Sequence, residues 1–117
     1  MQEPEFIYKI ATRAVTQAAR ASGAFTGMPI DVKDGYLHFS TAGQLPETLR
    51  LHFRGEGDLV LLALRTHDLG AALRWEPSRG GALFPHVYGP FPMAAVVHEA
   101  TIAVEADGTC RLPEWVR

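Results

Sequence analysis

The fold is constrained most strongly at residues 58–64, where the sequence DLVLLAL contains a continuous apolar run. Successive side chains of a strand point to opposite faces, so this run is apolar on both. Strands of that kind lie at the centre of a sheet that is covered on two sides. The longest apolar runs are also far below the ~20 residues that a membrane-spanning helix needs. We therefore expect a folded domain organised around one central strand.

The patterns around this strand predict a single α+β domain over residues 1–117, with its core at about 6–112. Helices come early and strands late, which favours a mixed or mostly antiparallel sheet of about six strands with two or three short helices. The predicted strands cover residues 6–10, 36–40, 58–64, 73–76, 82–88 and 96–105, and the predicted helices cover 12–22 and about 46–53.

Capping and breaking residues refine these bounds. Thr12 is a suitable N-cap and Gly23 a suitable C-terminal stop for the first helix. The glycines and proline of residues 23–35 predict a long loop, with a short extended piece at 30–32. Pro85 interrupts the strand at 82–88, and because proline cannot donate to a sheet ladder, we expect an edge strand there.

Composition limits the classes of function. The formal net charge of −2 and pI near 6.2 argue against bulk binding of nucleic acid or of an anionic membrane. The N-terminus shows no basic segment followed by an apolar one, and the single cysteine, Cys110, cannot form an internal disulfide. We expect a soluble cytoplasmic protein. Its oligomeric state is left open by these features.

The first candidate site is the stretch DGYLHFST at residues 34–41. Alternation along a strand points Tyr36, His38 and Ser40 one way, and Leu37 and Phe39 the other. The first face presents a phenol, an imidazole and a hydroxyl to a polar ligand. The alternative is structural, with a core histidine and a serine that caps a helix.

The second candidate site covers residues 74–88 and combines charged, aromatic and imidazole side chains around a glycine turn. Its candidate residues are Arg74, Trp75, Glu76, Ser78, Arg79, His86 and Tyr88. Arginine on such a turn is a good phosphate ligand, and an aromatic ring can stack on a base. The alternative is an exposed hairpin loop beside a buried Trp75. The histidine spacing matches no metal-binding motif, so we expect no metal.

Several motifs, taken in order, resemble a bacterial family known as domain of unknown function 952. They are IYKI at 7–10, DGYLHFST at 34–41, LRWEPSRGG at 73–81 and LFPHVYGP at 83–90. The resemblance covers nearly the whole chain, from about residue 6 to residue 97. The family name implies no reaction.

The same order of motifs resembles, more distantly, the NAD-binding half of RNA 2'-phosphotransferases and other ADP-ribosyltransferases. Tyr8-Lys9 falls where those proteins have a Tyr-His pair, and His38-Phe39-Ser40 falls on their His-hydrophobic-Ser strand. The resemblance implies an ADP-ribosyltransferase-like fold, NAD as cofactor, and ligand contacts from Tyr8, Lys9, Tyr36 and Ser40. It also implies His38 as a catalytic residue, with Glu76 the nearest candidate for the catalytic acid.

Two other functions stay open. The chain can be a non-catalytic module that binds an anionic small molecule or a partner protein through residues 74–88. It can also be a hydrolase that uses His38 with Ser40 or His86, although no orienting acid is identifiable from the sequence.

Overall fold

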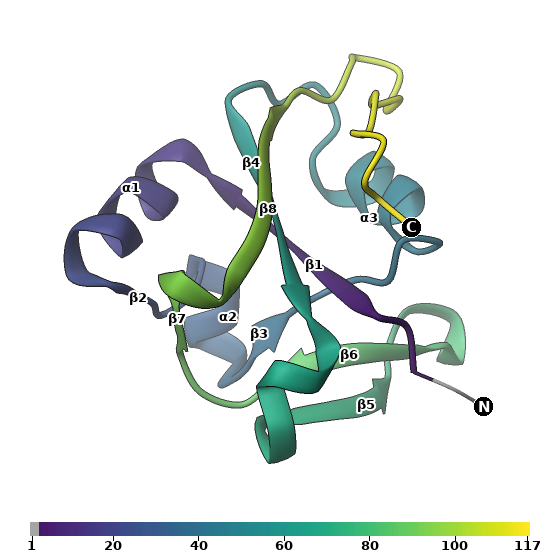
Figure 1. Cartoon of the computed structure of the whole chain (residues 1–117). Coiled ribbons are helices and arrows are strands. Elements are labelled where there is room, and N and C mark those ends of the chain that lie inside the picture. Colours follow the sequence, from purple (N-terminus) through teal and green to yellow (C-terminus); the bar gives the residue numbers. More distant parts are fainter. Residues whose placement is uncertain (1–2) are drawn as a thin grey trace.

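The computed structural model describes residues 3–117, in which antiparallel sheets are flanked by helices (Figure 1). The strands are β1 (Phe6–Thr12), β2 (Ala24–Phe25), β3 (Leu37–His38), β4 (Leu59–Arg65), β5 (Leu73–Pro77), β6 (Leu83–Val87), β7 (Phe91–Pro92) and β8 (Val96–Ile102). The helices are α1 (Arg13–Ser22), α2 (Pro29–Asp34) and α3 (Leu45–His52), with 3₁₀ turns η1 (Thr66–Ala72), η2 (Arg79–Gly81) and η3 (Met93–Ala95). The α+β class is confirmed. The described residues contain more strands than predicted, because the two-residue pair β2 and β7 was not expected.

Strand β4 is the centre of the first sheet, between β1 and β8. Its residues from Leu59 to Leu64 are all buried, which confirms the central strand predicted from the sequence. β1 pairs with β4 along its whole length, from Phe6 opposite Arg65 to Thr12 opposite Leu59. This sheet therefore has two buried faces, and each needs its own cover.

Helices α1 and α3 lie on opposite sides of the β1-β4-β8 sheet (Figure 1). On the α1 side, the core is formed by Ile7, Ala11, Ala19, Phe25, Leu37, Phe39, Val60, Leu62, Leu64, Val87 and Phe91. On the α3 side, it is formed by Phe6, Tyr8, Ile10, Leu45, Leu49, Leu59, Leu61, Ala63, Ile102 and Val104. Alternate residues of β4 enter the two clusters, as strand geometry requires.

The predicted helix ends are confirmed for α1. The Val15 N–H donates to the Thr12 hydroxyl at 3.2 Å, and the chain leaves the helix at Gly23 with φ of 89°. Helix α3 begins after a reciprocal pair of bonds. The Thr41 N–H donates to the Gln44 side chain at 3.0 Å, and the Gln44 N–H donates to the Thr41 hydroxyl at 3.2 Å.

The expected loop at 23–35 is wrong in its second half, which is helix α2 rather than an extended piece. Pro29 occupies the first turn of α2, where a missing N–H leaves no helical bond unmade. Asp31 then accepts the Met28 N–H at 2.7 Å, which stabilises the start of the helix. The proline and the glycines on either side, Gly27 and Gly35, therefore mark the ends of a short helix.

The expected edge position of the Pro85 strand is also wrong, because β6 lies between β3 and β5 in a second antiparallel sheet. The Pro85 carbonyl accepts the Phe39 N–H at 3.0 Å. Proline has no N–H to return that bond, and β3 ends one residue earlier, at His38. The sheet tolerates a central proline because its neighbour is only two residues long.

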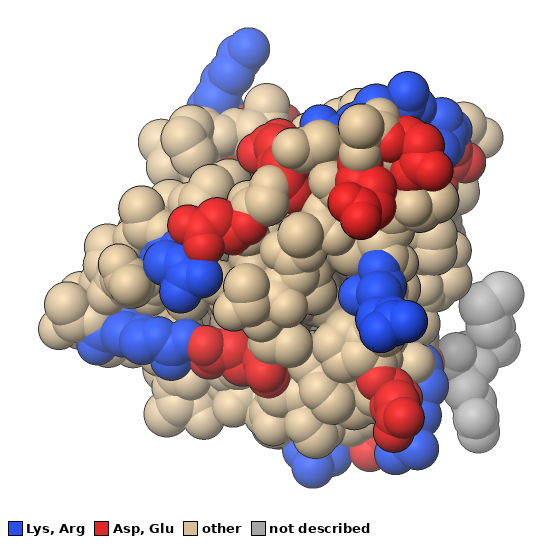
Figure 2. All heavy atoms as spheres, turned by 90° about the horizontal axis from the view of Figure 1, so that it is seen from above, with Lys and Arg blue, Asp and Glu red and all other residues tan. Residues whose placement is uncertain are grey.

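The C-terminal segment packs back on the first sheet. Trp115 stacks on His98, with ring centroids 5.0 Å apart, and the Tyr8 hydroxyl donates to the Arg117 carbonyl at 3.0 Å. Acidic and basic side chains lie interspersed on the face that Figure 2 shows. No helix in residues 3–117 has both the length and the apolar character to cross a membrane.

Candidate functional site

One face of the β3-β6-β5 sheet carries a cluster of the predicted site residues. His38 of β3 lies directly opposite His86 of β6, which in turn lies opposite Arg74 of β5. Alternation along the strands adds Glu76 and Tyr88 to this face. The other face packs into the core and includes Trp75, which was predicted to bind ligand but donates its indole N–H to Glu3 at 2.9 Å.

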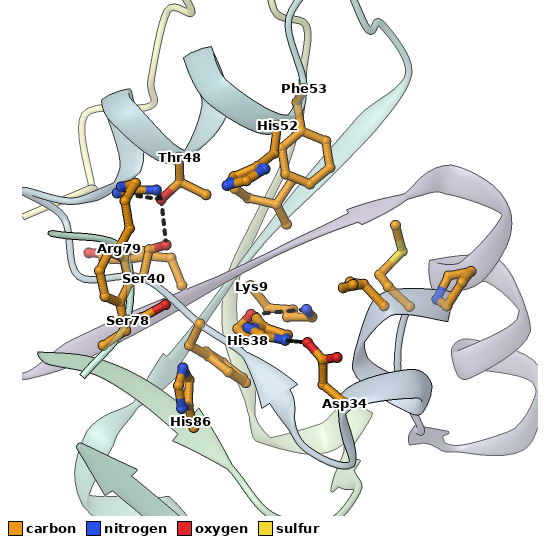
Figure 3. Close-up of a pocket in the computed structure, with 17 residues that line it drawn as sticks. Lys9, Asp34, His38, Ser40, Thr48, His52, Phe53, Ser78, Arg79 and His86 are labelled. Atoms are coloured by element: carbon orange, nitrogen blue, oxygen red, sulfur yellow. Dashed lines mark hydrogen bonds and ion pairs between the residues drawn. The ribbon is translucent and has the colours of Figure 1, made fainter. Parts of the chain in front are cut away.

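A cavity of about 570 Å³ lies at this face, between α2 and α3 (Figure 3). Its lining includes seven of the predicted site residues, namely Tyr8, Lys9, His38, Ser40, Ser78, Arg79 and His86. It also includes residues that sequence reasoning did not single out, namely Ile10, Met28, Pro29, Ile30, Asp34, Phe39, Thr48, His52, Phe53 and Phe84. The volume falls within the range of small-molecule sites in proteins.

Hydroxyl groups and an arginine form one end of the cavity. The Ser40 and Thr48 hydroxyls are 3.2 Å apart, and both terminal nitrogens of Arg79 donate to the Thr48 hydroxyl at 3.4 Å. The Arg79 guanidinium also lies 4.8 Å from the centre of the Phe84 ring, which supports it from one side. None of the ion pairs in the described residues involves Arg79.

Two imidazoles form the floor of the cavity, and each meets a carboxylate. His38 Nε2 is 2.8 Å from an oxygen of Asp34, and His86 Nδ1 is 2.9 Å from an oxygen of Glu76. The two rings are 5.3 Å apart at their centroids and 72° from coplanar. The Tyr36 ring packs against both, at 4.7 Å from His38 and 4.3 Å from His86.

Glu76 does not line the cavity and reaches it through His86. The Tyr88 hydroxyl donates to the same Glu76 oxygen at 2.7 Å, and the Arg74 guanidinium lies over the Tyr88 ring at 4.6 Å. These donors, Tyr88 first and His86 second, lower the pKa of Glu76. The same hydrogen bond raises the pKa of Tyr88. Glu76 is therefore an ionised group that orients an imidazole.

Lys9 lies under the cavity floor, and its ammonium already has protein partners for its hydrogens. Its Nζ is 2.8 and 3.0 Å from the two Asp31 oxygens and donates to the His38 carbonyl at 2.9 Å. The side chains of Lys9 and Asp31 are 3% and 1% exposed. Burial lowers the pKa of Lys9, and the Asp31 carboxylate opposes that shift. The pair joins β1, α2 and β3.

Few sequence features could have identified Asp31 and the cavity residues that the sequence analysis did not predict. Thr48 and His52 are one helical turn apart, so they share a face of α3, but the sequence does not tell which face meets the cavity. Met28, Pro29 and Ile30 come from the stretch expected to be a loop. In residues 3–117, no group of three or more His, Cys, Asp or Glu side chains is placed to hold a metal ion.

Comparison with known families decides the membership of the chain. The family described as "Protein of unknown function (DUF952)" matches residues 10–99. The chain belongs to the DUF952 family. The resemblance expected from the four sequence motifs is thereby confirmed at the level of the family, whose description names no reaction.

Two solved structures are similar to this DUF952 chain. The crystal structure of protein CC0527 from Caulobacter crescentus is similar to this chain, with 47% identity and a TM-score of 0.86 over 92% of this chain and 94% of that one. The solution NMR structure of CC0527 has 46% identity and a TM-score of 0.80 over 91% of each chain. No curated protein matches the chain.

Proposed function

We propose that this DUF952 protein binds a small anionic ligand, a nucleotide such as NAD or ADP-ribose, in the cavity between α2 and α3. The observation that carries the proposal is the position of Arg79. Its guanidinium meets a neutral hydroxyl at 3.4 Å rather than a carboxylate, and it lies beside the hydroxyls of Ser40 and Thr48. Such a group is suited to a phosphate, which accepts two parallel N–H bonds from arginine.

The remainder of the lining matches the other parts of a nucleotide. Met28, Pro29, Ile30 and Phe53 supply an apolar wall, and ligand sites combine such walls with a few polar groups that set orientation. His38 and His86 add polar edges at the floor. A base or nicotinamide ring can pack on the apolar wall while a phosphate meets Arg79.

The ADP-ribosyltransferase-like fold and an ADP-ribosyl or RNA 2'-phosphate transferase activity stay predictions that rest on the resemblance at Tyr8-Lys9 and His38-Ser40. In this proposal His38 contacts the nucleotide, and Glu76 acts through His86. Lys9 supports the site from below, because its contacts to Asp31 leave it to hold the floor rather than the ligand.

The test is a heteronuclear NMR titration of the full chain with NAD, ADP-ribose and nicotinamide. We expect shifts at Ser40, Thr48, Arg79 and His86, and at least a ~10-fold weaker Kd for Arg79→Met, because a charged hydrogen bond contributes about 1.5–3 kcal/mol. Arg111→Met, an exposed arginine outside the cavity, is the matched control.

Each result of the titration separates the alternatives. Binding with release of nicotinamide supports the transferase, and binding without turnover of NAD favours the non-catalytic module. No shifts with any ligand at millimolar concentration would refute the nucleotide proposal. Equal weakening by Arg79→Met and Arg111→Met would remove Arg79 from the site.

A further inference from the structure

His38 and His86 form a pair whose geometry differs from that of two isolated core histidines. They are directly opposite each other on neighbouring antiparallel strands, and both line the cavity (Figure 3). Their ring centroids are 5.3 Å apart and nearly perpendicular. Because the two rings lie side by side at the cavity floor, both can meet the same small ligand group.

The carboxylates select which nitrogen of each ring is free. An ionised carboxylate accepts a hydrogen, so Asp34 holds the proton on His38 Nε2 and Glu76 holds it on His86 Nδ1. In the neutral rings, His38 Nδ1 and His86 Nε2 then carry the lone pairs. This is the orientation logic by which a carboxylate prepares a histidine for proton transfer.

The surrounding charges come from three elements and the segment beside β3. Lys9 of β1 contacts the His38 backbone rather than its ring, and Asp34 of α2 contacts the ring itself. Tyr36 packs against both imidazoles, and burial is the main cause that raises its pKa, which keeps the phenol neutral. Arg74 and Glu76 of β5 face His86 from the other side.

The geometry points to an acid–base pair that cleaves a cyclic phosphodiester of a ribonucleoside, and this inference rests on the nucleotide site proposed above. At the start one imidazole is neutral and the other is protonated. The neutral imidazole takes a proton from water, whose oxygen forms a new bond to phosphorus. One ring P–O bond breaks, and the other imidazole gives its proton to the departing ribose oxygen. The product is a nucleoside phosphomonoester, and the two histidines have exchanged protonation states.

Two features favour a cyclic nucleotide as the substrate, namely an acid that can protonate the leaving group and the size of the cavity. An alkoxide is a poor leaving group, so it needs an acid such as a protonated imidazole at hand. Arg79 lies where it can hold a charged phosphate oxygen. A cavity of about 570 Å³ accepts a mononucleotide.

The experiment incubates the full chain with adenosine 2',3'-cyclic phosphate and follows the phosphomonoester by ³¹P NMR. We expect product, and a bell-shaped dependence of kcat/KM on pH, because the reaction needs one imidazole neutral and the other protonated. His38→Asn and His86→Asn should each lose about 100-fold or more in kcat. Both variants, purified identically, also reveal any contaminating phosphodiesterase, and their ¹H–¹⁵N spectra report folding.

Glu76 is a positioning residue in this scheme, and its test separates that role from a structural one. Glu76→Gln should lower kcat more than it changes KM and should move one limb of the pH profile, while its ¹H–¹⁵N spectrum stays folded. A change in stability alone, with the profile unmoved, would refute the orienting role.

Binding of adenosine 2'-monophosphate, a product of the proposed reaction, distinguishes this inference from the proposed site. Binding without cleavage of the cyclic ester overturns the acid–base pair and leaves the nucleotide site intact. Absence of binding by the monophosphate, NAD and ADP-ribose, together with absence of cleavage, overturns both. Cleavage that both histidine variants retain at the wild-type rate overturns the pair as the catalyst.

Discussion

The cavity has two cationic side chains, Lys9 and Arg79, that differ in how fully the protein satisfies their hydrogen bonds. Lys9 is buried beneath the floor, where two Asp31 oxygens and a backbone carbonyl accept its hydrogens. Arg79 is half-buried at the rim and has no ion pair among the described residues. It meets a hydroxyl at 3.4 Å and the face of a phenylalanine, and its charge also acts on the Glu47 carboxylate. Both residues were predicted from the sequence as ligand contacts.

A polar residue that lines a cavity is therefore available to a ligand only when its hydrogen-bond partners within the protein are incomplete. A buried charge must be paired and hydrogen-bonded, so Lys9 contributes to the fold. A partly exposed guanidinium can keep its hydrogens for a ligand, because water satisfies them in the meantime. A change at Lys9 should therefore lower stability, whereas a change at Arg79 should weaken binding and leave stability nearly unchanged.

The largest expected effect is on stability at Lys9. Lys9→Met leaves the Asp31 carboxylate buried without its partner, which should cost about 3–5 kcal/mol in the free energy of unfolding. Urea denaturation measures this loss. The double variant Lys9→Met/Asp31→Leu removes both charges, although Asp31 also accepts the Met28 and His38 N–H groups, so we expect partial recovery. A loss below about 1 kcal/mol for Lys9→Met would mean that the pair is not structural.

The next effect is expected at Gly27, which lies against the same aspartate. Its φ is +127°, and an added Cβ would be 3.0 Å from Asp31 Cβ and 3.2 Å from Leu37 Cδ2. Gly27→Ala should destabilise by more than about 1 kcal/mol. Gly23→Ala is the control, because Gly23 also has a positive φ, +89°, but no atom within 4 Å of an added Cβ. Thermal unfolding of both variants isolates the crowding at Asp31, and equal losses would show that backbone strain alone acts.

A smaller effect, on pH dependence, is expected at Glu76. Its folded-state pKa lies below the ordinary 4.5, so its contribution to stability is present above that pH and is lost as the pH falls through the folded value. Glu76→Gln lacks this contribution at every pH. The difference in unfolding free energy between wild type and Glu76→Gln should shrink as the pH falls below 4.5. Urea midpoints in acidic buffers measure it, and a constant difference would contradict the assignment.

The smallest effect on stability is expected at Arg79. Arg79→Met should change the free energy of unfolding by no more than about 0.5 kcal/mol, because its bonds to Thr48 are long and it has no carboxylate partner in the described residues. The same variant should weaken nucleotide binding. A large loss of stability would place Arg79 with Lys9 among the structural residues.

Local sequence signals were enough for elements whose cause is local. The apolar run at 59–64 and the caps at Thr12 and Gly23 are confirmed because a buried strand and a helix terminus depend on neighbouring residues. The prediction that Leu37 and Phe39 oppose His38 is likewise confirmed, with the first two in the core. Family membership followed from short motifs in order.

The expectations that were wrong depended on distant residues. Pro85 lies in a central strand because its neighbour β3 stops at His38, which no feature of residues 82–88 reveals. Residues 29–34 form a helix whose Asp31 is buried against Lys9, and that pairing spans more than twenty positions of the chain. Tertiary contacts override local propensity in such cases.

The α+β class, the central strand, the polar face of the 36–40 stretch and the family could all be predicted from local sequence patterns. The pairing of His38 with His86, the ion pair of Lys9 with Asp31, and the position of Thr48 and His52 in the cavity lining became visible only in the folded chain. The two groups differ in the range of the interactions involved. Periodicity and capping act between residues a few positions apart, whereas strand order and the pairing of buried charges depend on which segments meet in space.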